Sequence, residues 1–188
     1  PTRPIRFVVG FLPGGPSDTL ARMVGAKLSE QVGQAVIVDN RAGAGGNVAA
    51  EITAVATADG HTILLGTGGP FVIAPITGQK VRFDPDRDFA PITKLGDSMS
   101  LLAAHPSTGF THWKDLVAAA KAKPGEINYA SSGVGTIHHL AAELLSSMTG
   151  IRMNHIPYKG SGAVLPAMLS GEVGVGFGPI LPAKPHVK

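Results

Sequence analysis

Residues 5–31 read IRFVVGFLPGGPSDTLARMVGAKLSEQ, and this stretch combines a strand, a glycine loop and a helix. Residues 5–9 form a short, mostly apolar run that ends at Gly10, which predicts a strand. Residues 17–31 predict a helix, because apolar side chains recur at helical spacing at Leu20, Met23, Val24 and Leu28. A strand, a loop and a helix in this order are the unit from which parallel sheets are built.

The order of strand, loop and helix recurs along the rest of the chain. Further helices are predicted at residues 48–58, 137–148 and 163–169, together with one that Thr111 caps and that ends before Pro124. Strands are predicted at residues 35–38, 62–65, 91–95, 98–104, 128–130, 152–156 and 173–177. Strands that alternate with such helices form parallel sheets covered on both faces, so the predicted fold class is α/β. The two blocks, residues 1–100 and 101–188, predict two domains joined through extended segments.

The composition fits a folded protein and excludes several classes of protein. Of the 188 residues, 44% are hydrophobic and only 15% are charged, so the chain can bury a core. The absence of cysteine excludes disulfide scaffolds and zinc–thiolate sites. Residues 60–79 form the longest uncharged window, but its glycines and prolines rule out a transmembrane helix. Lys and Arg occur without a cluster, which argues against nucleic-acid binding despite the net charge of +3.

Four glycine-rich loops follow predicted strands, at residues 10–16, 41–47, 66–70 and 131–136. Ligands of parallel α/β proteins bind beyond the carboxyl ends of the strands. Glycine lets backbone N–H groups approach a ligand, and a helix N-terminus adds unpaired donors and partial positive charge. Such loops in both blocks predict a cleft that binds an anion from two sides. Nucleotides are disfavoured, because the first loop lacks the P-loop lysine and Val48 and His138 replace the third glycine of a dinucleotide fingerprint.

The sequence contains only weak patterns for catalysis or metal binding. His139 and Glu143 lie four residues apart on one predicted helix face, but a metal site needs a third ligand, which no nearby residue suggests. No Gly-x-Ser-x-Gly elbow surrounds Ser131 or Ser132, so neither serine is favoured as a nucleophile.

Three other side chains are candidates for a role in binding or packing. Asp18 lies in the first turn of its predicted helix, where its carboxylate either interacts with the helix dipole or contacts the ligand. Trp113 falls in an apolar stripe and is expected in the core. Tyr158 follows Pro157 at a strand end, where it either lines the cleft or packs structurally.

Several motifs occur in a fixed order along almost the whole chain. The first are RPIR at residues 3–6, PGGPSD at 13–18, DNRAGAGGN at 39–47, ADGHT at 58–62 and DPDRDF at 84–89. They are followed by KAKPG at 121–125, ASSGVGTIHHLA at 130–141 and HIPYKG at 155–160. Together these motifs resemble the solute receptors of tripartite tricarboxylate transporters, the Bug family.

The resemblance implies an architecture like that of type II periplasmic binding proteins, with two α/β domains of parallel or mixed sheets around a cleft that closes like a Venus flytrap. It implies capture of a small mono-, di- or tricarboxylate or acidic amino acid in the periplasm, after removal of a signal peptide, and delivery to membrane permease subunits. No catalysis, cofactor or metal is implied. Carried over by position, the ligand-binding residues are Phe11, Pro13, Gly14, Gly15, Ser17, Asp18, Thr67, Gly68, Ser131, Ser132, Gly133, Gly135, Thr136, His138, Tyr158, Phe177 and Gly178.

Two departures from the family pattern affect these expectations. Residues 66–70 are richer in glycine than the usual loop, which weakens side-chain specificity there. The chain stops at Lys188, where family members continue, so we expect the first domain to lack its C-terminal return segment. Two alternatives stay open. One is a hydrolase or transferase of similar architecture acting on an anionic substrate. The other is a truncated fragment that binds nothing and forms a domain-swapped or other oligomer.

Overall fold

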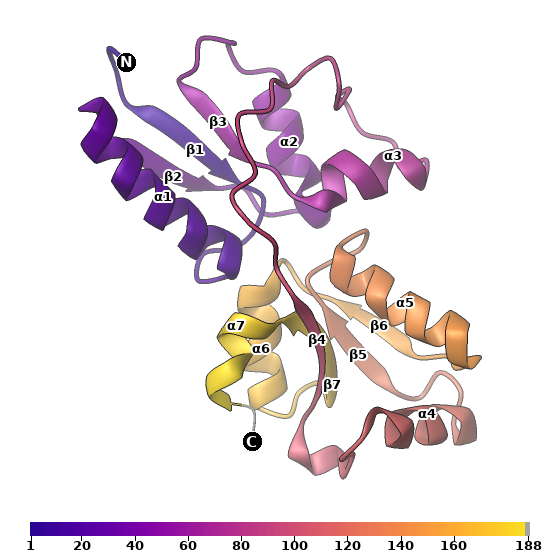
Figure 1. The fold of residues 1–188 in the computed structure, drawn as a ribbon. Coiled ribbons are helices and arrows are strands. Elements are labelled where there is room, and N and C mark those ends of the chain that lie inside the picture. Colours follow the sequence, from indigo (N-terminus) through magenta and orange to yellow (C-terminus); the bar gives the residue numbers. More distant parts are fainter. Residues whose placement is uncertain (187–188) are drawn as a thin grey trace. The chain divides into compact units, whose positions relative to one another are not determined.

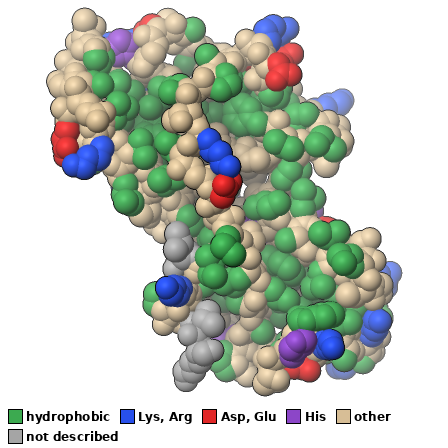
Figure 2. All heavy atoms as spheres, in the orientation of Figure 1, with side chains coloured by type: hydrophobic (Ala, Val, Ile, Leu, Met, Phe, Trp, Pro, Cys, Tyr) green, Lys and Arg blue, Asp and Glu red, His purple; other side chains and the backbone are tan. Residues whose placement is uncertain are grey.

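The protein divides into two compact units, Pro1–Gly96 and Asp97–Lys188, and each has its own sheet (Figure 1). The computed structural model describes residues 1–186. The α/β class expected from the sequence is confirmed in both units. None of the helices in the described range is long and apolar enough to cross a bilayer. On the face shown in Figure 2, Lys and Arg side chains are scattered and do not form one basic patch.

The sheet of the first unit has three parallel strands in the order β2–β1–β3. β1 spans Ile5–Val9, β2 spans Val36–Asn40 and β3 spans Thr62–Leu65. β1 lies in the middle, so side chains on both of its faces are buried, which accounts for its apolar run Phe7, Val8 and Val9.

Two helices pack on this first sheet. α1 (Pro16–Val32) packs along β2 and β1, and α2 (Asn47–Ala54) packs against β3 and β1 (Figure 1). Proline at the first position suits the start of α1, because its missing N–H would have no helical partner there. α1 ends at Gly33, whose φ of 68° closes the helix in the left-handed conformation.

The segment after β3 is mostly irregular. A short π-helical turn, Gly69–Ile73, leads into α3 (Ala74–Ile76), and Phe71 packs edge-on against Phe89 with ring centroids 4.9 Å apart. The strand predicted at residues 91–95 is wrong. This segment is exposed and pairs with no strand in the described part of the chain, and its first residue, Pro91, lacks the N–H that a ladder requires.

The sheet of the second unit has four strands in the order β4–β7–β5–β6. β4 spans Ser100–Ala104, β5 Asn128–Ser131, β6 Asn154–Pro157 and β7 Val175–Pro179. β5 pairs in parallel with both β6 and β7, whereas β4 is antiparallel to β7, so this sheet is mixed. The expectation of parallel or mixed sheets is therefore confirmed.

The second unit contains α4 (Trp113–Ala122), α5 (Ile137–Thr149), α6 (Ser161–Leu169) and the short α7 (Ile180–Ala183). Its main core consists of side chains from α4, α5 and the sheet, namely Leu116, Tyr129, Ala142, Val175 and Phe177. A smaller cluster of Ala130, Val164 and Val173 lies under α6.

The start of α4 differs from the prediction. His112, not Thr111, is the N-cap, and its Nδ1 accepts a hydrogen bond from the Lys114 N–H at 3.1 Å. Asp115 completes the capping box by accepting from the His112 N–H at 2.8 Å. Trp113 is 47% exposed rather than in the core, because the first helical position turns outward and Leu116 and Ala120 occupy the buried face.

Candidate functional site

The carboxyl ends of β1, β2 and β3 share one edge of the first sheet, where three glycine-containing loops pack together. A Cβ at Gly10 would lie 2.8 Å from the Cα of Gly46. A Cβ at Gly46 would lie 3.3 Å from Cγ of Pro70 and 3.5 Å from Oγ1 of Thr67. Gly10 and Gly46 therefore let the loops pack against one another, a role that the sequence analysis did not assign to them.

The loop between β1 and α1 is fixed by Asp18. This side chain is only 5% exposed, and its carboxylate accepts hydrogen bonds from the Gly14 N–H and from Nε of Arg22, both at 3.0 Å. An ion pair of 2.9 Å joins the other carboxylate oxygen to Arg22. Burial alone raises the pKa of the Asp18 carboxyl, but these hydrogen bonds outweigh burial and hold the pKa below its usual value. Asp18 thus holds the loop in place, through Gly14.

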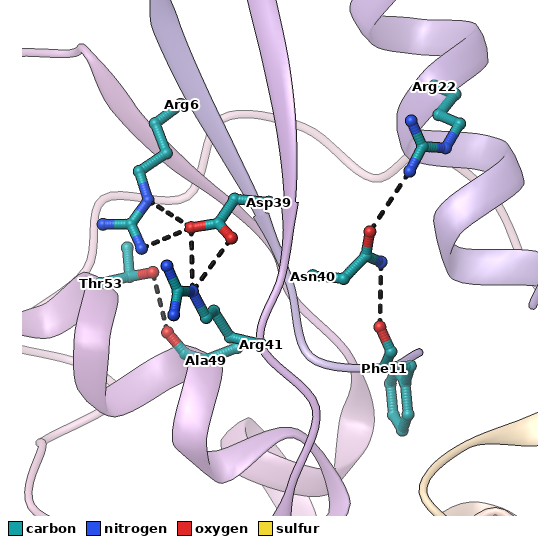
Figure 3. A network of polar contacts seen from close by, with 8 residues as sticks. All are labelled: Arg6, Phe11, Arg22, Asp39, Asn40, Arg41, Ala49 and Thr53. Carbon is teal, nitrogen blue, oxygen red and sulfur yellow. Dashed lines mark hydrogen bonds and ion pairs between the residues drawn. The ribbon is translucent and has the colours of Figure 1, made fainter. Parts of the chain in front are cut away.

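Asn40, at the end of β2, fixes the same loop from the other side. Its Nδ2 donates to the carbonyl of Phe11 at 2.9 Å, and its Oδ1 accepts from Arg22 at 3.3 Å (Figure 3). The neighbouring Asp39 lies between Arg6 and Arg41, with Nε–O distances of 2.7 Å and 3.0 Å (Figure 3). Asn40 belongs to the motif DNRAGAGGN at residues 39–47, but that motif alone does not predict the contact of Asn40 with Phe11.

Replacing Asp18 by asparagine should lower the free energy of unfolding at pH 7 by about 1–2 kcal/mol, because it removes charged hydrogen bonds. The expected loss of unfolding free energy is small because Arg22 is 53% exposed and water screens its ion pair with Asp18. The folded-state pKa of Asp18 is depressed, so its stabilisation is present above the unfolded pKa of about 4 and is lost as the pH falls through the folded value.

Urea denaturation at pH 7 and pH 3 measures this effect. The difference between wild type and Asp18→Asn should shrink at pH 3, and the exposed neighbour variant Thr19→Ala should stay within about 0.5 kcal/mol of wild type at both pH values. An equal difference at the two pH values would show that the Asp18 charge contributes nothing.

In the second unit, residues 131–136 connect β5 to α5 and contain most of the buried polar side chains there. Gly133 and Gly135 have φ of 128° and 73°, and residues other than glycine rarely adopt such values. The N-cap of α5 is Thr136, whose Oγ1 accepts from the His139 N–H at 3.4 Å and donates to the Gly133 carbonyl at 2.7 Å. The loop is therefore held rigidly at the start of the helix.

This loop presents free backbone donors. Within the described residues, the N–H groups of Val134, Ile137 and His138 donate to no protein acceptor, whereas those of Gly133 and Gly135 bond to side chains. Unpaired N–H groups at a helix N-terminus carry partial positive charge and suit an anionic oxygen.

Two serine–histidine contacts of 2.6 Å lie beside these donors. Ser132 Oγ contacts Nδ1 of His138, and Ser131 Oγ contacts Nε2 of His155. Ser132 also donates to Thr136 Oγ1 at 3.2 Å. Burial lowers the pKa of His138, so this ring is neutral at pH 7 and offers a hydrogen bond without charge.

The structure places the other predicted ligand-binding residues in different surroundings. In the first unit, Pro13 and Gly14 are exposed, Phe11 and Ser17 half-buried and Gly15 buried, and Thr67 and Gly68 follow β3. In the second unit, the ring of Phe177 lies in the core, 5.8 Å from the Tyr129 ring, and Gly178 lies next to it in β7. Tyr158 donates through its hydroxyl to Glu172 at 2.8 Å and through its N–H to the Ser131 carbonyl at 3.0 Å.

His139 and Glu143 lie 3.9 Å apart on α5. Among residues 1–186, no group of three or more His, Cys, Asp or Glu side chains is arranged to hold a metal ion.

Comparison with known proteins gives close relatives. A family model described as "Tripartite tricarboxylate transporter family receptor" matches residues 20–188. A protein from the tcbD–tcbE intergenic region of Pseudomonas sp. (strain P51) is 39% identical over 173 residues, and Protein BugT of Bordetella pertussis is 37% identical over 174 residues. Each alignment covers 92% of this chain but only 51% and 53% of these relatives, so the chain spans about half their length.

Solved structures of similar proteins share the fold. MatC from Rhodopseudomonas palustris with bound malate has a TM-score of 0.92 and 30% identity, over 99% of this chain and 64% of that chain. The R. palustris protein Rpa4515 with adipate has a TM-score of 0.90 and 36% identity, over 98% and 62%. The periplasmic binding protein BugD has a TM-score of 0.90 and 29% identity, over 100% and 62%.

Proposed function

Because this chain belongs to the tripartite tricarboxylate transporter receptor family, we propose that it is part of a periplasmic solute-binding protein that captures a small organic carboxylate. Membrane permease subunits of the transporter would receive the ligand. Two similar structures were solved with malate and adipate, which are both dicarboxylates, and this supports the proposed ligand class.

The observation that carries the proposal is the set of free N–H donors at the start of α5. Val134, Ile137 and His138 offer three N–H groups next to the buried hydroxyls of Ser132 and Thr136. A carboxylate oxygen accepts such bonds without a neighbouring cation, since the helix N-terminus supplies partial positive charge. The loop of residues 10–15 in the first unit, fixed by Asp18 and Asn40, is the second surface that we propose for ligand binding.

The enzyme alternative requires a side-chain nucleophile that a substrate can reach. Ser131 is fully buried, accepts from the Gly133 N–H at 3.1 Å and contacts His155, so its oxygen is engaged within the protein. Ser132 is buried, and its hydroxyl donates to Thr136 Oγ1 at 3.2 Å, so its proton is directed at Thr136 and not at His138. We therefore propose binding without catalysis, with these hydroxyls fixing the loop.

Titration calorimetry with malate and adipate tests the ligand class, and 1,6-hexanediol serves as an uncharged control of the same length as adipate. We expect saturable binding of at least one dicarboxylate and none of the diol. At a hundredfold excess over Kd, a bound ligand should stabilise the protein by about 2.7 kcal/mol. Absence of binding by every small carboxylate tried would reject the proposal.

The pair Ile137→Pro and Ile137→Ala tests the backbone donors. Proline is tolerated at the first position of a helix and removes only the N–H, and Thr136 already has the extended conformation that a residue before proline prefers. The Ile137 side chain is 59% exposed, so its loss should matter little in either variant. We expect Ile137→Pro to bind the dicarboxylate about tenfold more weakly than Ile137→Ala. Equal affinities would show that this N–H does not contact the ligand.

A further inference from the structure

Three aromatic rings form a stack that contacts residues 131–136. The His155 ring lies between Tyr129, at a centroid distance of 4.8 Å, and His139, at 4.3 Å, and the interplanar angles are 12° and 14°. Tyr129 and His155 are direct neighbours across β5 and β6, and His139 comes from the first turn of α5. The stack thus fixes His155 between the sheet and the helix.

The stack contacts this loop at two points, Ser131 and Gly135. Nε2 of His155 lies 2.6 Å from Ser131 Oγ, and this oxygen accepts from the Gly133 N–H at 3.1 Å. Nδ1 of His139 accepts from the Gly135 N–H at 3.4 Å. The position of the loop therefore depends on the His155 ring through Ser131, and on the His139 ring through Gly135.

We propose that His155 positions the carboxylate-binding loop through Ser131 and takes up a proton when a carboxylate binds there. This inference rests on the proposed function. The contact with Ser131 survives in both protonation states, because a neutral Nε2 accepts from the hydroxyl and a protonated one donates to it. The Ser131 hydroxyl then turns to the Gly133 carbonyl, 3.3 Å away.

The charges around the stack set the direction of the pH effect. Burial lowers the pKa of His155, the adjacent His139 lowers it further, and Glu143 acts in the opposite direction. Glu143 accepts from the Tyr129 hydroxyl at 2.8 Å and lies 3.9 Å from Nε2 of His139. The unliganded ring is thus neutral at pH 7. A bound carboxylate raises the His155 pKa, because an anion stabilises the cation, so affinity should rise as the pH falls.

Three substitutions separate the contributions of this ring. His155→Gln places an amide near the position of Nε2, so it retains a partner for Ser131 but cannot titrate. His155→Phe retains the stacking ring and loses the hydrogen bond. His105→Gln is the matched control, because His105 is a half-buried histidine of the same unit that bonds to Ser107.

Calorimetry of malate and adipate between pH 5.5 and 8, in buffers of different ionisation enthalpy, measures affinity and proton uptake together. We expect wild type and His105→Gln to bind about three- to tenfold more tightly at pH 5.5 than at pH 7.5, with proton uptake. His155→Gln should bind within about threefold of wild type at pH 7.5 and show a much weaker pH dependence than wild type, because His138, which contacts Ser132 in the same loop, and the ligand's own carboxyl groups still titrate. His155→Phe should bind about tenfold or more weakly.

Wild-type affinity in His155→Phe, or an unchanged pH profile in His155→Gln, would overturn the proposal.

Amide hydrogen exchange at Gly133 and Gly135 in the unliganded protein tests the positioning role without any ligand. Exchange should be faster in His155→Phe and restored in His155→Gln. Wild type could bind neither dicarboxylate while amide exchange is still faster in His155→Phe and restored in His155→Gln. That result would reject the proposed ligand class and support the positioning of the loop by His155. Identical exchange in all variants would reject the positioning role.

Discussion

Replacing Tyr129 by alanine is expected to lower the free energy of unfolding of the second unit by about 3–5 kcal/mol. Tyr129 is fully buried, packs edge-on against Phe177 at 5.8 Å and stacks on His155. Alanine would leave a cavity between β5, β7 and α5 and remove the base of the ring stack. Urea denaturation followed by fluorescence measures the loss, because the single tryptophan, Trp113, lies in this unit.

The control is Tyr129→Phe, which keeps the ring and removes only the hydroxyl that donates to Glu143 at 2.8 Å. Glu143 is 54% exposed and can bond to water, so this variant should lose only about 1 kcal/mol. A comparable loss in both variants would place the stabilisation in the hydrogen bond and contradict the packing argument.

Local sequence patterns predicted the regular elements well where burial determines them. The apolar run of β1 and the helical spacing of α1 gave bounds within one residue of those observed. The strand predicted at residues 91–95 fails because an apolar residue such as Ile92 does not form a strand without a partner, and Ile92 is 80% exposed. The N-cap of α4 was displaced by one residue because Asp115 accepts from the N–H groups of both Thr111 and His112.

The site was predictable only in part. Glycine and serine in residues 131–136 identify a loop whose backbone can approach an anion, and that pattern is local. The two side chains that the sequence analysis missed act over long separations. His155 reaches Ser131 across 24 residues because Tyr129 and His155 are register partners, and Asn40 reaches Phe11 across 29. Such pairings depend on strand register, which a single sequence does not reveal.

The second large effect is expected for Gly10→Ala, which should destabilise the first unit by about 3 kcal/mol. Its added Cβ would meet the Cα of Gly46 at 2.8 Å and the carbonyl oxygen of Gly46 at 3.3 Å. Both are backbone atoms, so relief requires a shift of a loop rather than a change of rotamer, which places the cost at the upper end for overpacking. Hydrogen exchange at the amides of β1 should become about 100-fold faster if these amides exchange by unfolding of the unit.

Gly68→Ala is the matched control at the same edge of the sheet. Gly68 has φ of −61° and ψ of −22°, a helical conformation that alanine adopts readily, and among residues 1–186 no atom beyond Gly68 and its two chain neighbours lies within 4 Å of the Cβ position. This variant should therefore be neutral or slightly more stable, because alanine reduces the entropy of the unfolded chain. If the β1 amides of both variants exchanged at the wild-type rate, the added Cβ of Gly10→Ala would not lower the stability of the first unit. Gly10 would then not be required for the packing of its loop against Gly46. If both were destabilised equally, the contact with Gly46 would not be the cause, since Gly68 lacks such a contact.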